Sequence, residues 1–122
     1  MTRNNADFFN QVSAESLTSR RLFHVSPREN RESIESTGLK PQPQHGWGPK
    51  GVYINPDNPL PQYGDDVYEV TPSKSLELFH DQNDFGKAMY SKKSVSASDV
   101  KRVGHVYGHT EIHWHPEEQC ND

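Results

Sequence analysis

Short runs of β-branched and aromatic residues, separated by turn residues, dominate the chain. These runs occupy 21–26, 51–55, 66–71, 87–91, 100–106 and 110–115. Most are bounded by Gly, Pro, Asp or Ser, and runs of this length with such boundaries are typical of β-strands. The pattern therefore predicts about six short strands.

One helix is predicted between the first two strands, over 27–37. Ser26 can cap it, Pro27 suits the first helical position, and Glu29 can close a capping box. Gly38 then fits the left-handed position just past a helix end. A second, marginal helix or a loosely docked arm is expected over 1–18, where Phe8, Val12 and Leu17 fall near helical spacing.

The remaining segments are predicted to be irregular. Two prolines and two glycines, followed by Pro49, make a loop of 40–50, and 56–65 forms another. Residues 80–86 have turn composition, 96–99 suggest a single helical turn, and the type of 73–79 is left open. Because only one firm helix accompanies the strands, the order of elements predicts the α+β class rather than a doubly wound sheet.

Composition limits the domain organisation and the classes of function. The 122 residues predict one domain, assigned to 19–116 and followed by an acidic tail at 117–122. Hydrophobic residues make up only 30% of the chain, so the core should be thin. No apolar run reaches the ~18 residues of a membrane span. The net charge of −4 argues against general nucleic-acid binding, and the single Cys120 points to a reducing cytoplasm.

Residues 104–116 hold four of the seven histidines, all at odd positions. Side chains alternate between the two faces of a strand, so Val106, Ile112 and Trp114 would face the core and the histidines would face water. A bulge at Gly104 or Gly108 would break this register. A metal site using two of the histidines with Glu111 is the alternative. We predict the solvated face and no metal.

Four segments, taken in order, resemble the ADP-ribosyltransferase superfamily. They are "LFHVSPRENRESIESTGLKP", "GVYIN", "DDVYEVTP" and "SKKSVSASDVKRVG", and together they span roughly residues 20–106. The resemblance implies small antiparallel sheets packed face to face, with one main helix between strands 1 and 2. It also implies NAD as a substrate and cleavage of the bond between nicotinamide and ribose.

The same resemblance implies the site residues. His24 would hydrogen-bond a ribose hydroxyl, backbone groups of Val25 would hold the nicotinamide amide, and Tyr53 would stack on the nicotinamide ring. Ser26 would assist in binding NAD. The family's catalytic glutamate has no counterpart in 87–91, so Glu111 is taken as the acid that could reach the site.

Two functions follow from this resemblance. The first is ADP-ribosyl transfer to a protein or nucleic-acid acceptor. The second is a catalytically degenerate module that binds or inhibits another protein, with the Trp47 loop and the acidic 115–122 segment as contacts. Transfer to an RNA 2′-phosphate, a variant of the first, would use Arg20, Arg21 or Arg28.

Overall fold

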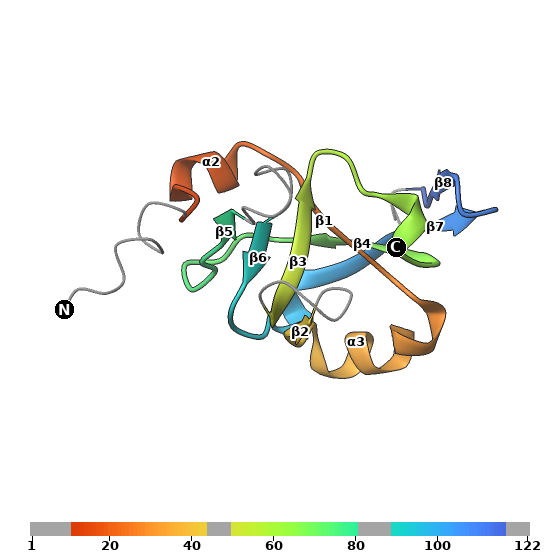
Figure 1. Cartoon of the computed structure of the whole chain (residues 1–122), viewed down its shortest axis with the longest axis horizontal. Coiled ribbons are helices and arrows are strands. Elements are labelled where there is room, and N and C mark those ends of the chain that lie inside the picture. Colours follow the sequence, from red (N-terminus) through yellow and green to blue (C-terminus); the bar gives the residue numbers. More distant parts are fainter. Residues whose placement is uncertain (1–10, 44–49, 81–88, 117–122) are drawn as a thin grey trace.

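The computed structural model of the chain describes residues 11–43, 50–80 and 89–116. Its helices are α2 (Ala14–Thr18) and α3 (Arg31–Thr37), with 3-10 turns at Arg28–Asn30, Pro61–Tyr63 and Ala97–Asp99. Its strands are β1 (Leu22–Ser26), β2 (Gln42–Pro43), β3 (Lys50–Pro56), β4 (Asp66–Val70), β5 (Phe79–His80), β6 (Met89–Ser91), β7 (Val100–Tyr107) and β8 (Glu111–Trp114). The predicted α+β class is confirmed (Figure 1).

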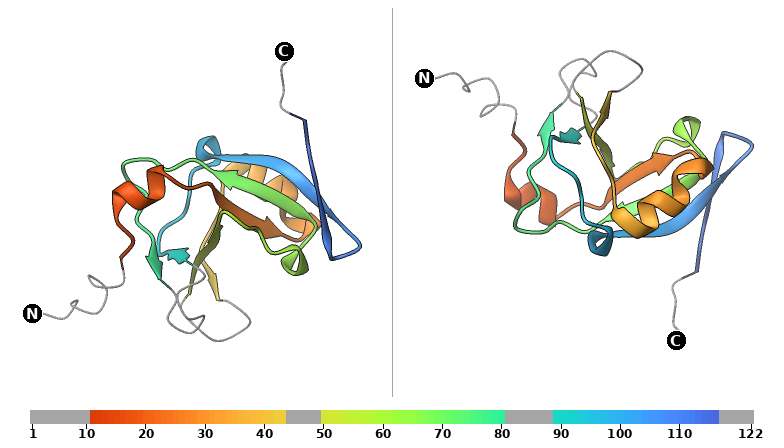
Figure 2. Two further views of the ribbon diagram at one scale, coloured as in Figure 1. Left: turned by 90° about the horizontal axis from the view of Figure 1, so that it is seen from above. Right: turned by 90° about the horizontal axis from the view of Figure 1, so that it is seen from below.

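All the strand pairings between these elements are antiparallel. Seven strands form one hydrogen-bonded path in the order β5-β6-β3-β1-β4-β7-β8, and β2 pairs with β3 beside it. The expectation of separate sheets packed face to face is therefore replaced by one continuous path. In the middle of this path β1 and β3 share only two registered residue pairs, whereas β1 and β4 share five. Figure 2 shows the two halves of the path turned away from each other at this junction.

Two clusters of buried side chains lie on opposite faces of β1 and β4. Leu22, Tyr68 and Val70 belong to the larger cluster, which also takes in Ile34 of α3. Phe23, Val25 and Val67 form the smaller cluster. Alternation along each strand sends neighbouring residues to different clusters, so both faces of this half of the sheet are covered. A thin core on each side agrees with the low hydrophobic content.

The segment before β1 packs with the rest of the domain. Val12 and Leu17 are buried in the larger cluster, and the Val12 amide donates to the Leu78 carbonyl at 2.7 Å. The expected helix here is α2, capped by the Ser13 side chain, which accepts from the Ser16 amide. Phe8 and the rest of 1–10 lie outside the described residues, as does the tail at 117–122.

The predicted helix over 27–37 divides into the 3-10 turn and α3, and its capping differs from the prediction. Ser26 is a buried strand residue, and its hydroxyl accepts from the Asn30 side-chain amide at 3.0 Å rather than from a backbone N–H. Instead, the Asp65 carboxylate accepts from the Arg28 amide at 2.9 Å. The predicted Gly38 position is confirmed, with φ of 85° and its amide bonded to the Ile34 carbonyl.

Two local predictions need correction. β2 lies inside the predicted loop 40–50, because Gln42 and Pro43 pair with Gly51 and Lys50. Near the C-terminus, the bulge falls beside Gly104 rather than on it, since Val67 pairs with Gly104 and Tyr68 with Arg102. His105 therefore still lies directly opposite His113. Within the described residues, no helix is both long enough and apolar enough to cross a membrane.

Candidate functional site

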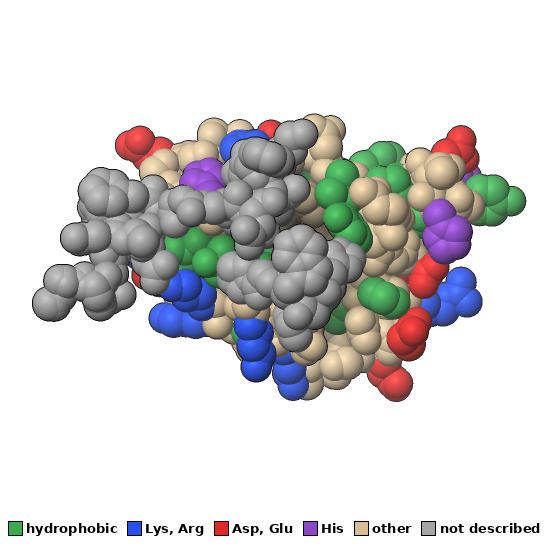
Figure 3. Space-filling model, in the orientation of Figure 1, with side chains coloured by type: hydrophobic (Ala, Val, Ile, Leu, Met, Phe, Trp, Pro, Cys, Tyr) green, Lys and Arg blue, Asp and Glu red, His purple; other side chains and the backbone are tan. Residues whose placement is uncertain are grey.

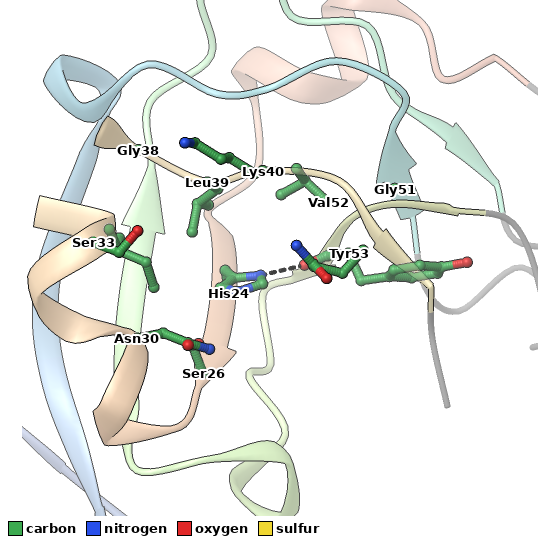
Figure 4. Close-up of a pocket in the computed structure, with 12 residues that line it drawn as sticks. His24, Ser26, Asn30, Ser33, Gly38, Leu39, Lys40, Gly51, Val52 and Tyr53 are labelled. Carbon is green, nitrogen blue, oxygen red and sulfur yellow. Dashed lines mark hydrogen bonds between the residues drawn. The ribbon is translucent and has the colours of Figure 1, made fainter. Parts of the chain in front are cut away.

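A cavity of about 340 Å³ opens where β1 and β3 separate, beside α3. Its walls come from β1 (His24, Ser26), from the turn and helix that follow (Asn30, Ser33), from the loop after α3 (Lys40) and from β3 (Tyr53). Figure 4 shows these side chains around the opening. Cavities that bind small molecules range from roughly 300 to 1,000 Å³, so this one suits part of a nucleotide-sized ligand.

His24 joins the two separating strands through its side chain. Beyond Phe23 and Asn55, no further registered pair links β1 to β3, and the His24 Nδ1 atom instead lies 2.7 Å from the Tyr53 carbonyl oxygen. A carbonyl only accepts, so Nδ1 carries the proton and donates. In the neutral ring Nε2 is then an acceptor. The imidazole both links the strands and offers one acceptor atom.

Burial lowers the pKa of His24, and the hydrogen bond to the Tyr53 carbonyl, which favours the charged form, offsets this only in part. The ring is therefore neutral at pH 7. A neutral ring bonded through Nδ1 must present Nε2 as a hydrogen-bond acceptor. Hydroxyl and amide N–H groups of a ligand are the donors that fit it.

Ser26 and Asn30 form a polar pair at the base of the cavity. The Ser26 residue is 3% exposed, and its hydroxyl oxygen accepts from the Asn30 side chain at 3.0 Å. That bond leaves the serine proton and the Asn30 carbonyl oxygen to interact with a ligand. The pair was expected in part: Ser26 was predicted at the site, whereas Asn30 was not.

The structure brings His24 and Tyr53 together on the wall of one cavity. In the view of Figure 4 the Tyr53 ring extends from β3 away from the imidazole. It stacks on Tyr90 of β6, with ring centroids 5.6 Å apart and an interplanar angle of 29°. Tyr53 therefore contributes its carbonyl to His24 and its ring to the outer part of the opening.

The other predicted site residues are not brought to this cavity through their side chains. Val25 packs its side chain in the smaller core cluster, so only its backbone remains for the predicted contact. Glu111 lies on β8, beside His113 at 3.5 Å, and does not line the cavity. Glu69, the other strand acid, is held by Arg21 at 2.8 and 3.0 Å. None of the described residues that line the cavity is acidic.

Sequence reasoning missed the lining residues Asn30, Ser33 and Lys40. Asn30 and Ile34 are four residues apart, and Ser33 lies between them, so all three fall on one helical face. Ile34 is buried against the sheet, which turns this face toward β1. The helical spacing was therefore an available signal, but it identified a face only after the sheet was known.

Behind the cavity, α3 is held to the sheet by a buried ion pair. Arg31 donates to both carboxylate oxygens of Asp66, at 2.7 and 2.9 Å, and Asp66 is fully buried. Burial of the Asp66 carboxyl opposes its ionisation, but the hydrogen bonds and charge of Arg31 outweigh this effect and lower its pKa. The pair fixes the position of α3 relative to β4.

The C-terminal histidines form a separate cluster on the β7–β8 hairpin. The His105 ring centroid lies 5.4 Å from that of His113 and 5.3 Å from that of His115, and Tyr107 lies 5.3 Å from His113. His105 Nδ1 is 3.1 Å from His115 Nε2, which is a hydrogen-bonding distance between the two rings. Burial, then Arg102 and His105, lower the pKa of His115. Among described residues, no group of three or more His, Cys, Asp or Glu could hold a metal ion.

The hairpin orientation follows the predicted alternation, with one correction. Val106 and Ile112 pack against the smaller core cluster as expected. Trp114 lies on the same face but is 48% exposed, and its ring covers Phe23 at a centroid distance of 5.5 Å. It is exposed because β8 lies at the end of the strand order, with no strand beyond it in the described part of the chain.

The chain matches no protein-family model, no curated protein and no solved structure.

Proposed function

We propose that this protein binds NAD in the cavity between β1, β3 and α3 and transfers ADP-ribose to a protein or nucleic-acid acceptor. The observation that carries the proposal is the neutral His24 at the point where the two strands separate, with its Nε2 acceptor available to a ribose hydroxyl. The resemblance to ADP-ribosyltransferases in the order of sequence motifs supports the same function. The single Cys120 favours a cytoplasmic setting.

Cleavage of the bond between nicotinamide and ribose develops positive charge on the ribose, as in glycoside hydrolysis. A neutral imidazole suits this chemistry because it can orient a ribose hydroxyl without repelling that charge. Ser26 and Asn30 supply further polar groups for the nicotinamide riboside half of NAD. Lys40, which is the charged side chain among the described lining residues, supplies attraction for the phosphates.

A second function is favoured by the absence of an acid from the described lining residues. In this alternative the protein binds a partner and transfers nothing. Of the two contact segments suggested for it, the one around Trp47 lies outside the described residues, as does all of 115–122 beyond Pro116. A pull-down that returns one stoichiometric partner in the absence of NAD would favour the binding module.

The test has two parts. The purified chain is titrated with NAD in a calorimeter to measure binding, and released nicotinamide is measured by chromatography. Transfer predicts both binding and release, whereas the binding module predicts no NAD-dependent release with any acceptor. Absence of NAD binding under all conditions would exclude the first proposal.

The matched variants are His24→Asn and His113→Asn. An asparagine at 24 can still donate to the Tyr53 carbonyl from a position near Nδ1, but it offers no acceptor where Nε2 was. We expect it to weaken NAD binding by about 10-fold or more, since one hydrogen bond to a ligand is worth roughly 1–2 kcal/mol. His113→Asn, on the remote hairpin, should leave binding unchanged.

A further inference from the structure

The outer edge of β8 presents backbone groups that are not engaged in the described part of the chain. β8 pairs with β7 in a register that places His105 opposite His113, and the His115 amide donates to the Val103 carbonyl at 2.8 Å. Hydrogen bonding alternates along an antiparallel strand, so residues 111, 113 and 115 turn toward β7. The N–H and C=O groups of Ile112 and Trp114 therefore point away from the sheet.

The outer edge of β8 is only partly protected against strand pairing. Natural edge strands are blunted by short length, charged side chains, proline or a bulge; β8 (Glu111–Trp114) is short and begins with Glu111, but it contains no lysine, proline or bulge, and Pro116 follows only after its end. Trp114 is 48% exposed beside it. Figure 1 shows β8 at the rim of the molecule, and Figure 3 shows hydrophobic, histidine and acidic side chains gathered there.

The sequence of β8 and His115 suits antiparallel pairing with a second copy of itself. If two copies of β8 run antiparallel and centre on His113, Ile112 of each copy lies opposite Trp114 of the other. Glu111 of each copy then lies opposite His115 of the other, which pairs a carboxylate with an imidazole. Ile112 and Trp114 have backbone N–H and C=O groups that point away from β7. In this register these are the groups that bond across the two copies. Apolar cross-strand pairs favour such pairing, and the Glu111 carboxylate faces a neutral imidazole, which does not repel it, because the pKa of His115 is lowered by its burial.

We propose that the β8 edge is a homodimer interface, in which a second copy of this chain extends the sheet by antiparallel β8–β8 pairing centred on His113. The interface is isologous and closes after two copies, as a two-fold symmetric contact must. It forms a sheet that continues from β7 through both copies of β8. β8 does not line the cavity, so this assembly is independent of the proposed function.

The test is sedimentation velocity of the full chain from micromolar to millimolar concentration, with amide hydrogen exchange at the same concentrations. We expect a reversible dimer, and slower exchange of the Ile112 and Trp114 amides as the dimer forms. Ile112→Pro removes an N–H that faces away from β7 and so spares the β7–β8 pairing. Because symmetry doubles the loss to two hydrogen bonds, this variant should weaken association roughly 30-fold.

The register is tested by charge exchange. Glu111→Lys removes the carboxylate that faces the neutral His115 at both symmetry-related positions and should weaken the dimer about 10-fold, and adding His115→Glu places opposite charges across the strands and should restore it to within ~3-fold of the original. Glu77→Lys makes the same charge change on an exposed loop residue and should have no effect. Circular dichroism of each variant confirms that it is folded.

Three outcomes overturn the proposal: a monomer at every concentration, a dimer unaffected by Ile112→Pro and Glu111→Lys, or β8 amides protected only when an unrelated extended peptide is added. A dimer that Glu111→Lys weakens but His115→Glu does not restore would overturn the register centred on His113.

Discussion

The cavity and the β7–β8 hairpin both carry histidine, and they hold it in opposite ways. His24 is enclosed between two strands and has one defined partner, the Tyr53 carbonyl, which determines which ring nitrogen is protonated. On the hairpin, three histidines and Tyr107 make tilted ring contacts with one another. A backbone carbonyl beside the ring, rather than the number of imidazoles, therefore determines which nitrogen of a neutral histidine carries the proton and which is left as an acceptor.

The residues around the cavity are also more tightly packed than those of the β7–β8 hairpin. Beside the cavity, α3 is held by the buried Asp66–Arg31 pair, and Gly38 packs directly on the backbone of Val95. On the hairpin, Glu111 is largely exposed, and a side chain added at Gly108 would meet nothing within 4 Å. Equivalent substitutions in the two regions should therefore have unequal effects.

The largest difference is expected between two carboxylates. Asp66→Ala removes the buried partner of Arg31, whose side chain is 35% exposed and can be hydrated in its place, and should lower the free energy of unfolding by about 2–3 kcal/mol. Glu111→Ala should change it by less than ~1 kcal/mol, because exposed ion pairs contribute little. Urea denaturation of both variants measures the two values. Equal losses would show that the two regions do not differ as described.

The two glycines with positive φ provide the next test. Gly108→Ala, at φ 65°, should cost about 1–2 kcal/mol, which is the penalty for an L-residue in the left-handed region. Gly38→Ala, at φ 85°, carries that penalty and also places a Cβ in collision with the Val95 carbonyl oxygen, so it should cost at least ~3 kcal/mol. Thermal unfolding ranks the two variants. The contrast fails if Gly108→Ala is the more destabilised.

The smallest expected effect is a pH dependence of stability. His24 has a lowered pKa when folded, so below about pH 6.5 the unfolded chain binds a proton that the folded chain does not. The free energy of unfolding should therefore fall as pH drops below 6.5, until the pH reaches the folded pKa.

Denaturation between pH 7.5 and 5 measures this slope, and His24→Asn should reduce it. His115 also has a lowered pKa and contributes in the same direction, so it must remain in both proteins compared. His113→Asn serves as the hairpin control. An identical slope in wild type and His24→Asn would rule out His24 as the source.

Local sequence was sufficient for the positions of the three strands at the centre of the sheet. The runs at 21–26, 51–55 and 66–71 became β1, β3 and β4 within one or two residues, because β-branched and aromatic residues bounded by turn residues favour strands in any context. The Ser96–Asp99 turn was also found, and Ser96 caps it with its own side chain.

Predictions that depended on distant residues were less accurate. Ser26 was expected to cap the helix, but it is buried in β1 and Asp65, thirty-nine residues later, bonds the Arg28 amide instead. β2 was predicted as loop because its partner strand, β3, supplies the pairing. Lys40 and Ser33 were missed at the cavity because neither belongs to a motif that marks a site. In each case the deciding contact is absent from the local sequence.

The sequence by itself determined the α+β class, the alternation of the hairpin and the presence of His24 and Tyr53 on the first strand and the strand after α3. Periodicity and residue preference act locally, so these features could be read before folding. Only the tertiary structure decided that β1 and β3 separate after two residue pairs, that His24 spans the gap, and that Glu111 lies on the remote edge. These features depend on strand order and on buried pairs such as Asp66–Arg31, which join residues far apart in the chain.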